Sequence, residues 1–246
     1  MFRKVIFVLM MCVFQLGLSL LMYPIWNGLI VDRQAEQAAE LFLSEVDARE
    51  ETQSTDPTEE TIPYQQLWDE MCAYNETLYA EKQVSFDSPD DYEQPSFNLL
   101  DYGLEDEVFA VLTARKINLE MPVYLGATDT HLAHGASHMS LTSLPIGGEN
   151  TNCVIAGHRG YNGASYFRYI EKLKVGDMVS ITNLWETLTY RVAEIKIIDP
   201  HEVKEILIQD GRDLVTLLTC HPYASGGRQR YVVYCERIET TITPTT

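Results

Sequence analysis

The spacing of apolar residues changes once along the chain, from a helical period to the alternation that strands show. Before residue 104, apolar side chains recur three and four positions apart, as they do on one face of a helix. From Val108 onward they fall in short, β-branched segments separated by Gly and Pro, a pattern typical of strands and turns. We expect strands at residues 108–112, 121–125, 154–157, 178–182, 188–198, 214–219 and 231–238, and short helices at 130–134 and 164–170. Many short strands with few helices predict a mainly β fold, a barrel preceded by a helical region.

The first 26 residues are the most apolar segment. The run from Val5 to Tyr23 is broken only by three small or polar residues. At about 1.5 Å per residue, a helix of this length approaches the ~30 Å hydrocarbon core of a bilayer. Arg3 and Lys4 precede the run and should stay in the cytoplasm, which places the remainder of the chain outside the cell.

We therefore expect an uncleaved N-terminal transmembrane anchor, and a single one, because no apolar run follows Ile238. A cleaved signal peptide is the alternative. Its apolar core would usually be shorter, and no clean small-x-small site precedes Pro24.

Between the anchor and the strands lies a helical stalk with two less regular stretches. Residues 32–53 are acidic and Ala-rich, as in a helix, and residues 51–63 are polar and Pro-punctuated, as in a linker. A second helix follows, whose apolar face is formed by Leu67, Met71, Tyr74 and Leu78. The chain thus divides into an anchor (1–26), a stalk with an irregular segment (27–106), a β-barrel domain (107–240) and a tail (241–246).

The charge of the chain excludes one class of partner. The formal net charge is −18 at pH 7. Nucleic-acid binding needs a basic face, so we expect no nucleic-acid partner. Lysine-bearing substrates are compatible with this acidity, but so is simple solubility of an exposed surface.

Five cysteines are present, and the odd count leaves at least one free thiol. Cys12 lies in the anchor, whereas Cys153 and Cys235 lie among apolar residues of expected strands. We expect these two to be buried free thiols, and a disulfide between them stays open at this point.

Three chemically capable side chains stand at strand ends. Cys220 ends the 214–219 strand, His158 follows the 154–157 strand, and Arg230 directly precedes the last strand. A thiol, an imidazole and a guanidinium are the parts of a cysteine acyl-transfer site. Each alone is more often structural: a buried small hydrophobe, a histidine bonded to backbone, a solvated arginine. Arg228 is an alternative to Arg230, since side chains alternate along a strand.

Each of these residues has a distinct expected role. Cys220 is the nucleophile, and His158 as imidazolium stabilises its thiolate and then protonates the departing amine. Arg230 stays protonated and suits the substrate carbonyl or its oxyanion. Thr219 and His221 flank the nucleophile and are candidates to support the substrate or oxyanion, His221 through its backbone N–H.

Together these segments resemble the sortases, the cysteine transpeptidases of the Gram-positive cell surface. The similarity covers about residues 74–238 and is carried by Thr-Leu-Leu-Thr-Cys at 216–220, Ala-Gly-His-Arg-Gly at 156–160 and the arginine before the last strand. The segments at 142–148, 173–177 and 220–223 resemble the class C, pilin-polymerising sortases in particular.

This resemblance implies a closed sortase-type β-barrel and a membrane-anchored enzyme with an extracellular catalytic domain and no cofactor. It implies cleavage of an LPXTG-like sorting signal after its threonine, a thioester on Cys220, and transfer of the acyl group to an amine. The donor would be a surface or pilin protein and the acceptor a pilin lysine, giving pili. Attachment to cell-wall peptide is an alternative, and a membrane-tethered binding module with a structural cysteine is another.

Class C sortases also carry an N-terminal lid over the site, usually anchored by an Asp-Pro-aromatic triplet. The irregular stretch between residues 81 and 104 lies where this lid should be. The candidate lid residues are Phe86, Asp87, Ser88, Pro89 and Tyr92. The compact triplet is not intact, and a connecting loop without a gating role is the alternative.

His131, His134 and His138 have a spacing that zinc sites can use on a helix. Gly135 interrupts that helix, and we expect no metal there.

Overall fold

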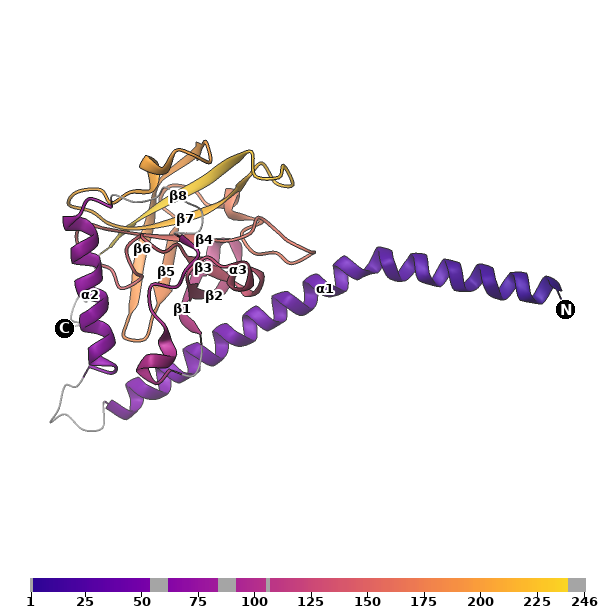
Figure 1. Cartoon of the computed structure of the whole chain (residues 1–246), viewed down its shortest axis with the longest axis horizontal. Coiled ribbons are helices and arrows are strands. Elements are labelled where there is room, and N and C mark those ends of the chain that lie inside the picture. Colours follow the sequence, from indigo (N-terminus) through magenta and orange to yellow (C-terminus); the bar gives the residue numbers. More distant parts are fainter. Residues whose placement is uncertain (1, 54–61, 84–91, 105–106, 239–246) are drawn as a thin grey trace, which may run out of the picture.

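The computed structural model describes residues 2–53, 62–83, 92–104 and 107–238. Its centre is a closed β-barrel with the strand order β1-β2-β3-β4-β7-β8-β6-β5 (Figure 1), which confirms the expected fold class. The strands are β1 (Val108–Ala114), β2 (Leu119–Leu125), β3 (Ala136–His138), β4 (Thr151–Ala156), β5 (Met178–Thr182), β6 (Thr187–Ile198), β7 (Asp213–His221) and β8 (Gln229–Arg237). The helices are α1 (Phe2–Gln53), α2 (Gln65–Ala80) and α3 (Asp129–His134), with short 3₁₀ turns η2 (Leu99–Tyr102), η3 (Arg115–Ile117), η4 (Ile170–Lys172) and η5 (Val203–Ile206).

β7 lies between one parallel and one antiparallel neighbouring strand. It pairs in parallel with β4, with Ala156 opposite Leu218, and antiparallel with β8, with Leu218 opposite Val232. The parallel pair brings the ends of two strands that lie far apart in the sequence to one rim of the barrel.

The alternation of side chains gives β7 an inner and an outer face. Val215 and Leu217 are fully buried in the large core that fills the barrel. Leu218 points the other way and packs with Val154, Val203 and Ile206 in a smaller cluster on the outside. β7 therefore has one face in the core of the barrel and the other on the outside of the barrel.

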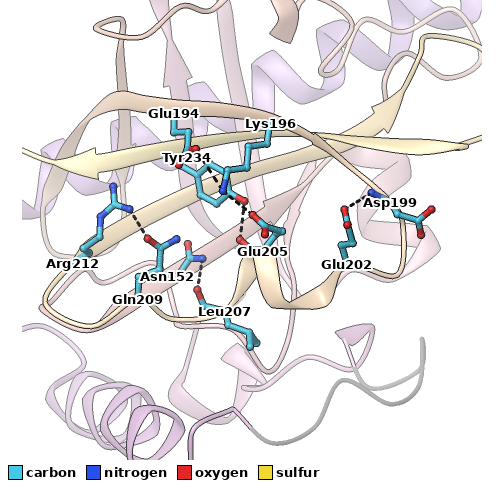
Figure 2. Close-up of polar contacts among 10 residues, drawn as sticks. All are labelled: Asn152, Glu194, Lys196, Asp199, Glu202, Glu205, Leu207, Gln209, Arg212 and Tyr234. Carbon is cyan, nitrogen blue, oxygen red and sulfur yellow. Dashed lines mark hydrogen bonds and ion pairs between the residues drawn. The ribbon is translucent and has the colours of Figure 1, made fainter.

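The β6–β7 connection covers this outer face and is held there by polar contacts (Figure 2). The buried Asn152 donates from Nδ2 to the carbonyl of Ile206 at 2.9 Å and accepts from the Thr216 hydroxyl at 2.7 Å. The Tyr234 hydroxyl donates to the carbonyl of Glu205 at 2.8 Å. These hydrogen bonds hold the β6–β7 connection in place against the outer face of the barrel.

α1 is one continuous helix that runs from the expected anchor into the expected stalk. One stripe of its C-terminal half is buried against the barrel and consists of Ala35, Ala39, Phe42 and Val46, while its N-terminal half extends away from the barrel (Figure 1). α2 buries Leu67 and Met71 of the expected apolar face, whereas Tyr74 and Leu78 are only partly buried and Asn75 is the third buried residue.

The helix expected at residues 164–170 is wrong. This segment consists of turns, with the amide of Phe167 donating to the carbonyl of His158 at 2.9 Å and Tyr166 at a φ of +41°. A helix cannot contain a residue with left-handed backbone geometry, so tertiary contacts override local propensity here. Strand β3 was not expected, because three residues are too short to show alternation.

Cys153 and Cys235 are buried free thiols. Both are register partners of Val215, one on β4 and the other on β8. A whole strand therefore separates them, about 10 Å at the usual strand spacing, too far for a disulfide.

Candidate active site

The parallel pairing of β4 and β7 sets His158 beside Cys220. The register ends with Ala156 opposite Leu218, and the amide of Gly157 donates to the carbonyl of Leu218 at 3.1 Å. Extended by two residues, this register would bring His158 level with Cys220, and both residues line one pocket. Side chains two apart share a face, so both lie on the outer face with Ala156 and Leu218.

Arg230 lies opposite Cys220 on the other side. The two are antiparallel register partners, and Arg230 Nη1 is 3.9 Å from Cys220 Sγ. The guanidinium is held by the carbonyl of Gly227 at 2.8 Å. Arg228 is exposed and precedes β8, so the geometry favours Arg230 of the two arginines.

These three residues line a groove of about 320 Å³ on the outer face of the barrel. The β6–β7 connection forms one wall with Pro200, Glu202, Val203 and Ile206, and the opposite wall includes Tyr92, Asp129 and Leu132. The groove is thus lined by residues from several segments that lie far apart in the sequence.

His158 is held between two aromatic rings. Tyr161 stacks on it with ring centroids 4.7 Å apart, and Tyr166 meets it edge-on at 5.8 Å. Burial lowers the pKa of His158, and the carboxylate of Asp129 opposes this only in part. Burial therefore favours the neutral form of the resting imidazole.

The side chains of Thr219 and His221 contact other protein groups, and their support of a substrate oxygen stays a prediction. The Thr219 hydroxyl is buried and donates to the carbonyl of Gly157 at 2.6 Å. This bond ties the end of β4 to β7, and thus His158 to Cys220. His221 Nδ1 lies 3.1 Å from Glu171 Oε1, and the His221 ring packs at a tilt against Tyr231, with ring centroids 5.7 Å apart.

Arg159, a buried arginine directly after His158, holds the backbone carbonyl of Cys220. Arg159 is only 5% exposed, and its Nη2 is 2.6 Å from the carboxylate of Glu171. Its Nη1 donates to the carbonyl of Cys220 at 3.3 Å and lies 3.1 Å from His221 Nδ1. The ion pair also lowers the pKa of Glu171. No local pattern marks this role, because the partners lie 12 and 61 residues away.

Of the candidate lid residues, Phe86, Asp87, Ser88 and Pro89 lie outside the described residues. Tyr92 is described and lines the groove. Its carbonyl accepts from the amides of Ala127 at 3.2 Å and Ser140 at 3.1 Å, so the chain enters the domain beside the site.

The three spaced histidines are each bonded to backbone carbonyls. His131 Nδ1 is 2.8 Å from the carbonyl of Gly126, and His134 Nδ1 is 2.7 Å from that of Thr130. His138 is fully buried, with Nε2 at 3.1 Å from the carbonyl of Ser143, and burial lowers its pKa to about 4. Within the described part of the chain, no three His, Cys, Asp or Glu side chains are grouped as metal ligands.

Comparisons with known proteins give the family. A family model described as the sortase domain matches residues 112–238, just over half of the chain. Sortase D of Bacillus subtilis (strain 168) is 29% identical over 130 residues, which cover 52% of this chain and 63% of that protein. Sortase A of Streptococcus agalactiae serotype III is 31% identical over 129 residues, half of each protein. The chain thus spans less than two thirds of these curated relatives.

Solved structures extend the match along most of the chain. Sortase C1 of GBS pilus island 1 has a TM-score of 0.69 at 27% identity and covers 86% of this chain and 96% of its own. Sortase C of Streptococcus pneumoniae has a TM-score of 0.66 at 29% identity, with coverage of 82% and 97%. The barrel, the strand-end thiol and the matched family model lead to one conclusion: the chain belongs to the sortase family and is most like its class C members.

Proposed function

We propose that this protein is a membrane-anchored cysteine transpeptidase of the class C type, which cleaves an LPXTG-like sorting signal and joins the acyl fragment to a lysine of a pilin. The observation that best supports this chemistry is that His158, Cys220 and Arg230 line one groove, with Arg230 Nη1 3.9 Å from the Cys220 sulfur. The similarity to the structure named as a sortase of a pilus island supports the pilin acceptor.

In the first half-reaction Cys220 becomes acylated. The neutral imidazole of His158 takes the thiol proton, and the sulfur attacks the carbonyl carbon of the signal threonine. Arg230, 3.9 Å from the sulfur, donates to the oxygen that gains negative charge. The C–N bond then breaks, and the imidazolium returns the proton to the leaving amine, which leaves a thioester and a neutral imidazole.

The second half-reaction runs through the same groups in reverse. The neutral imidazole takes a proton from the incoming lysine amine, which attacks the thioester carbon. The C–S bond breaks, an amide forms, and the proton passes to the thiolate. A neutral resting His158 suits both half-reactions, because each begins with removal of a proton.

The N-terminal half of α1 suits a membrane anchor. The helix contains a window of 18 residues with a mean hydropathy of 2.5, and none of that window is buried in the protein. We infer that this segment spans the membrane and that the barrel lies on its outer side.

Mass spectrometry after incubation with a sorting-signal peptide tests the proposal. Unmodified protein should gain the mass of the acyl fragment, and Cys220→Ala should gain none while it remains folded. Cys72→Ala, which removes another free and partly exposed thiol, is the matched control and should acylate normally. Acylation of the Cys220→Ala protein would refute the assignment.

The acceptor is tested by competition in the same assay. A pilin fragment with its lysine and a cell-wall peptide amine are supplied together, and the proposal expects products on the lysine. Products on the cell-wall peptide alone would leave a sortase but remove the pilin acceptor.

A further inference from the structure

The stripe of α1 that faces the protein continues beyond the barrel. Toward the N-terminus from Ala39 and Ala35, the same face carries Asp32 and Gly28, at the spacings of four and three residues that a helix face shows. Gly28 is buried, although its neighbours in the apolar segment are exposed. At these two positions the partner of α1 is a loop and not a strand.

That loop is the one that follows His158. Asn27 Nδ2 donates to the carbonyl of Asn162 at 3.1 Å, and the carboxylate of Asp32 accepts from the amide of Ser165 at 2.8 Å and from its hydroxyl at 3.2 Å. Between these contacts the helix backbone approaches the loop very closely. We call this set of contacts the seam; it consists of Asn27, Gly28 and Asp32 on α1 and of Asn162, Gly163 and Ser165 on the loop.

The close approach in the seam leaves no room for side chains. A methyl group at Gly28 would overlap the carbonyl group of Gly163, and one at Gly163 would overlap the carbonyl oxygen of Pro24. Gly163 also has a φ of +93°, which favours glycine. Two backbones therefore meet here in a way that only glycines allow.

The loop held by the seam carries both rings that enclose His158. Tyr161 precedes Asn162, and Tyr166 follows Ser165. The Tyr166 hydroxyl donates to the carbonyl of Ala133 in α3 at 2.6 Å. Burial, together with the nearby Asp32 carboxylate, raises the pKa of Tyr166 to about 12, so this donor keeps its proton.

We propose, on the premise of the transpeptidase function above, that the seam positions the imidazole of His158 by pressing the 161–166 loop against it. Asn27, Gly28 and Asp32 are then positioning residues of the reaction. Asp32 lies nine residues after Tyr23, about 13 Å along a helix, so the end of the apolar segment is rigidly connected to the catalytic loop.

The test compares Gly28→Ala with Gly17→Ala in the full-length protein in detergent micelles. Both changes add one methyl group to the same helix and favour helix formation, but a methyl group at Gly17 meets nothing within 4 Å. Gly28→Ala should lower kcat about tenfold with KM within about twofold, because small misplacements of a catalytic group are costly. Gly17→Ala should leave both constants unchanged.

A second readout needs no turnover. The His158 ring is followed by NMR across pH, with its signal assigned by His158→Gln. In Gly28→Ala, Tyr161 and Tyr166 should move away from His158 and expose its ring to water. The pKa of His158 should then rise toward its ordinary value, because burial is what lowers it. This readout remains available if the wild-type protein forms no acyl-enzyme, so failure of the seam and failure of the proposed function are distinguishable.

A second pair of variants guards against a folding defect in the first. Asp32→Ala and Glu36→Ala each remove one carboxylate from α1, and only Asp32 contacts the loop among the described bonds. A positioning role predicts a higher His158 pKa in Asp32→Ala alone. Loss of a nearby negative charge would by itself lower the pKa of His158. A lower or unchanged pKa of His158 in both Gly28→Ala and Asp32→Ala would therefore overturn the proposal.

Discussion

Cys220 lies between two arginines in contrasting environments, one buried and ion-paired and the other partly exposed. On the side of its backbone carbonyl, Arg159 is buried, paired with Glu171 at 2.6 Å and bonded to the carbonyl itself. On the side of its sulfur, Arg230 is partly exposed and is bonded only to backbone carbonyls and the thiol among the described residues. A guanidinium that is paired with a carboxylate already uses its N–H donors in that ion pair. A guanidinium without such a partner keeps its positive charge and its donors available for a substrate oxygen.

The same contrast separates two histidines. His138 is fully buried, with its ring bonded to backbone carbonyls, and has no path to the groove. His158 is half-buried and lines the groove. One set of groups is bonded within the protein, and the other lines the groove. The two sets should respond differently to substitution.

The largest expected effect is on the substrate side. Arg230→Ala should lower kcat/KM by about 10²- to 10³-fold, as the loss of one oxyanion donor does in other acyl-transfer sites, with little change in Tm. Steady-state kinetics and thermal melting measure the two quantities. Arg228→Ala is the matched control, because Arg228 is exposed and outside the strand, and should change kcat/KM less than about twofold. Equal losses in both variants would contradict the distinction.

Replacement of the structural arginine should instead lower stability. Arg159→Leu removes the donor to the carbonyl of Cys220 and the ion-pair partner of Glu171. Glu171 keeps His221 at 3.1 Å and can be rehydrated because it is 47% exposed. We expect the free energy of unfolding to fall by about 2 kcal/mol, less than for a fully buried pair. Urea unfolding measures it. Arg168→Leu, which removes only a stacking contact with Tyr223, should cost about 0.5 kcal/mol.

The smallest effect is the response of His138 to acid. Its pKa is about 4 when folded and 6.5 ordinarily, so the unfolded chain binds more protons between these values. Stability is therefore lost as the pH falls through this window, by about 0.8 kcal/mol between pH 7.5 and 6. His138→Gln keeps an N–H donor and cannot titrate. Its unfolding curve should depend less on pH over this range, and an unchanged dependence would show that other groups are responsible.

Much of the site could be predicted from local sequence because each functional residue lies at the end of a strand with a clear pattern. Alternation between residues 214 and 219 predicted β7 and the position of Cys220, and apolar β-branched residues before His158 predicted β4. The apolar face of α2 was predicted in the same way, because helix and strand periods are local properties.

Other features required the pairing of distant segments. The choice between Arg228 and Arg230 depends on where β8 begins, and the separation of Cys153 from Cys235 depends on β7 lying between their strands. The turn at residues 164–170 depends on contacts with α1 and with the carbonyl of His158. None of these partners is near in sequence.

By itself, the sequence determined the periods of the elements, the residue at the end of each strand and the family to which the motifs belong. Only the tertiary structure decided that β4 lies parallel to β7, that Arg159 is buried beneath the nucleophile, and that α1 reaches the loop beside His158. The physical reason is that periodicity follows from the backbone geometry of neighbouring residues. Strand order, burial of a charge and close approach of two backbones instead depend on the free energy of the whole packed chain.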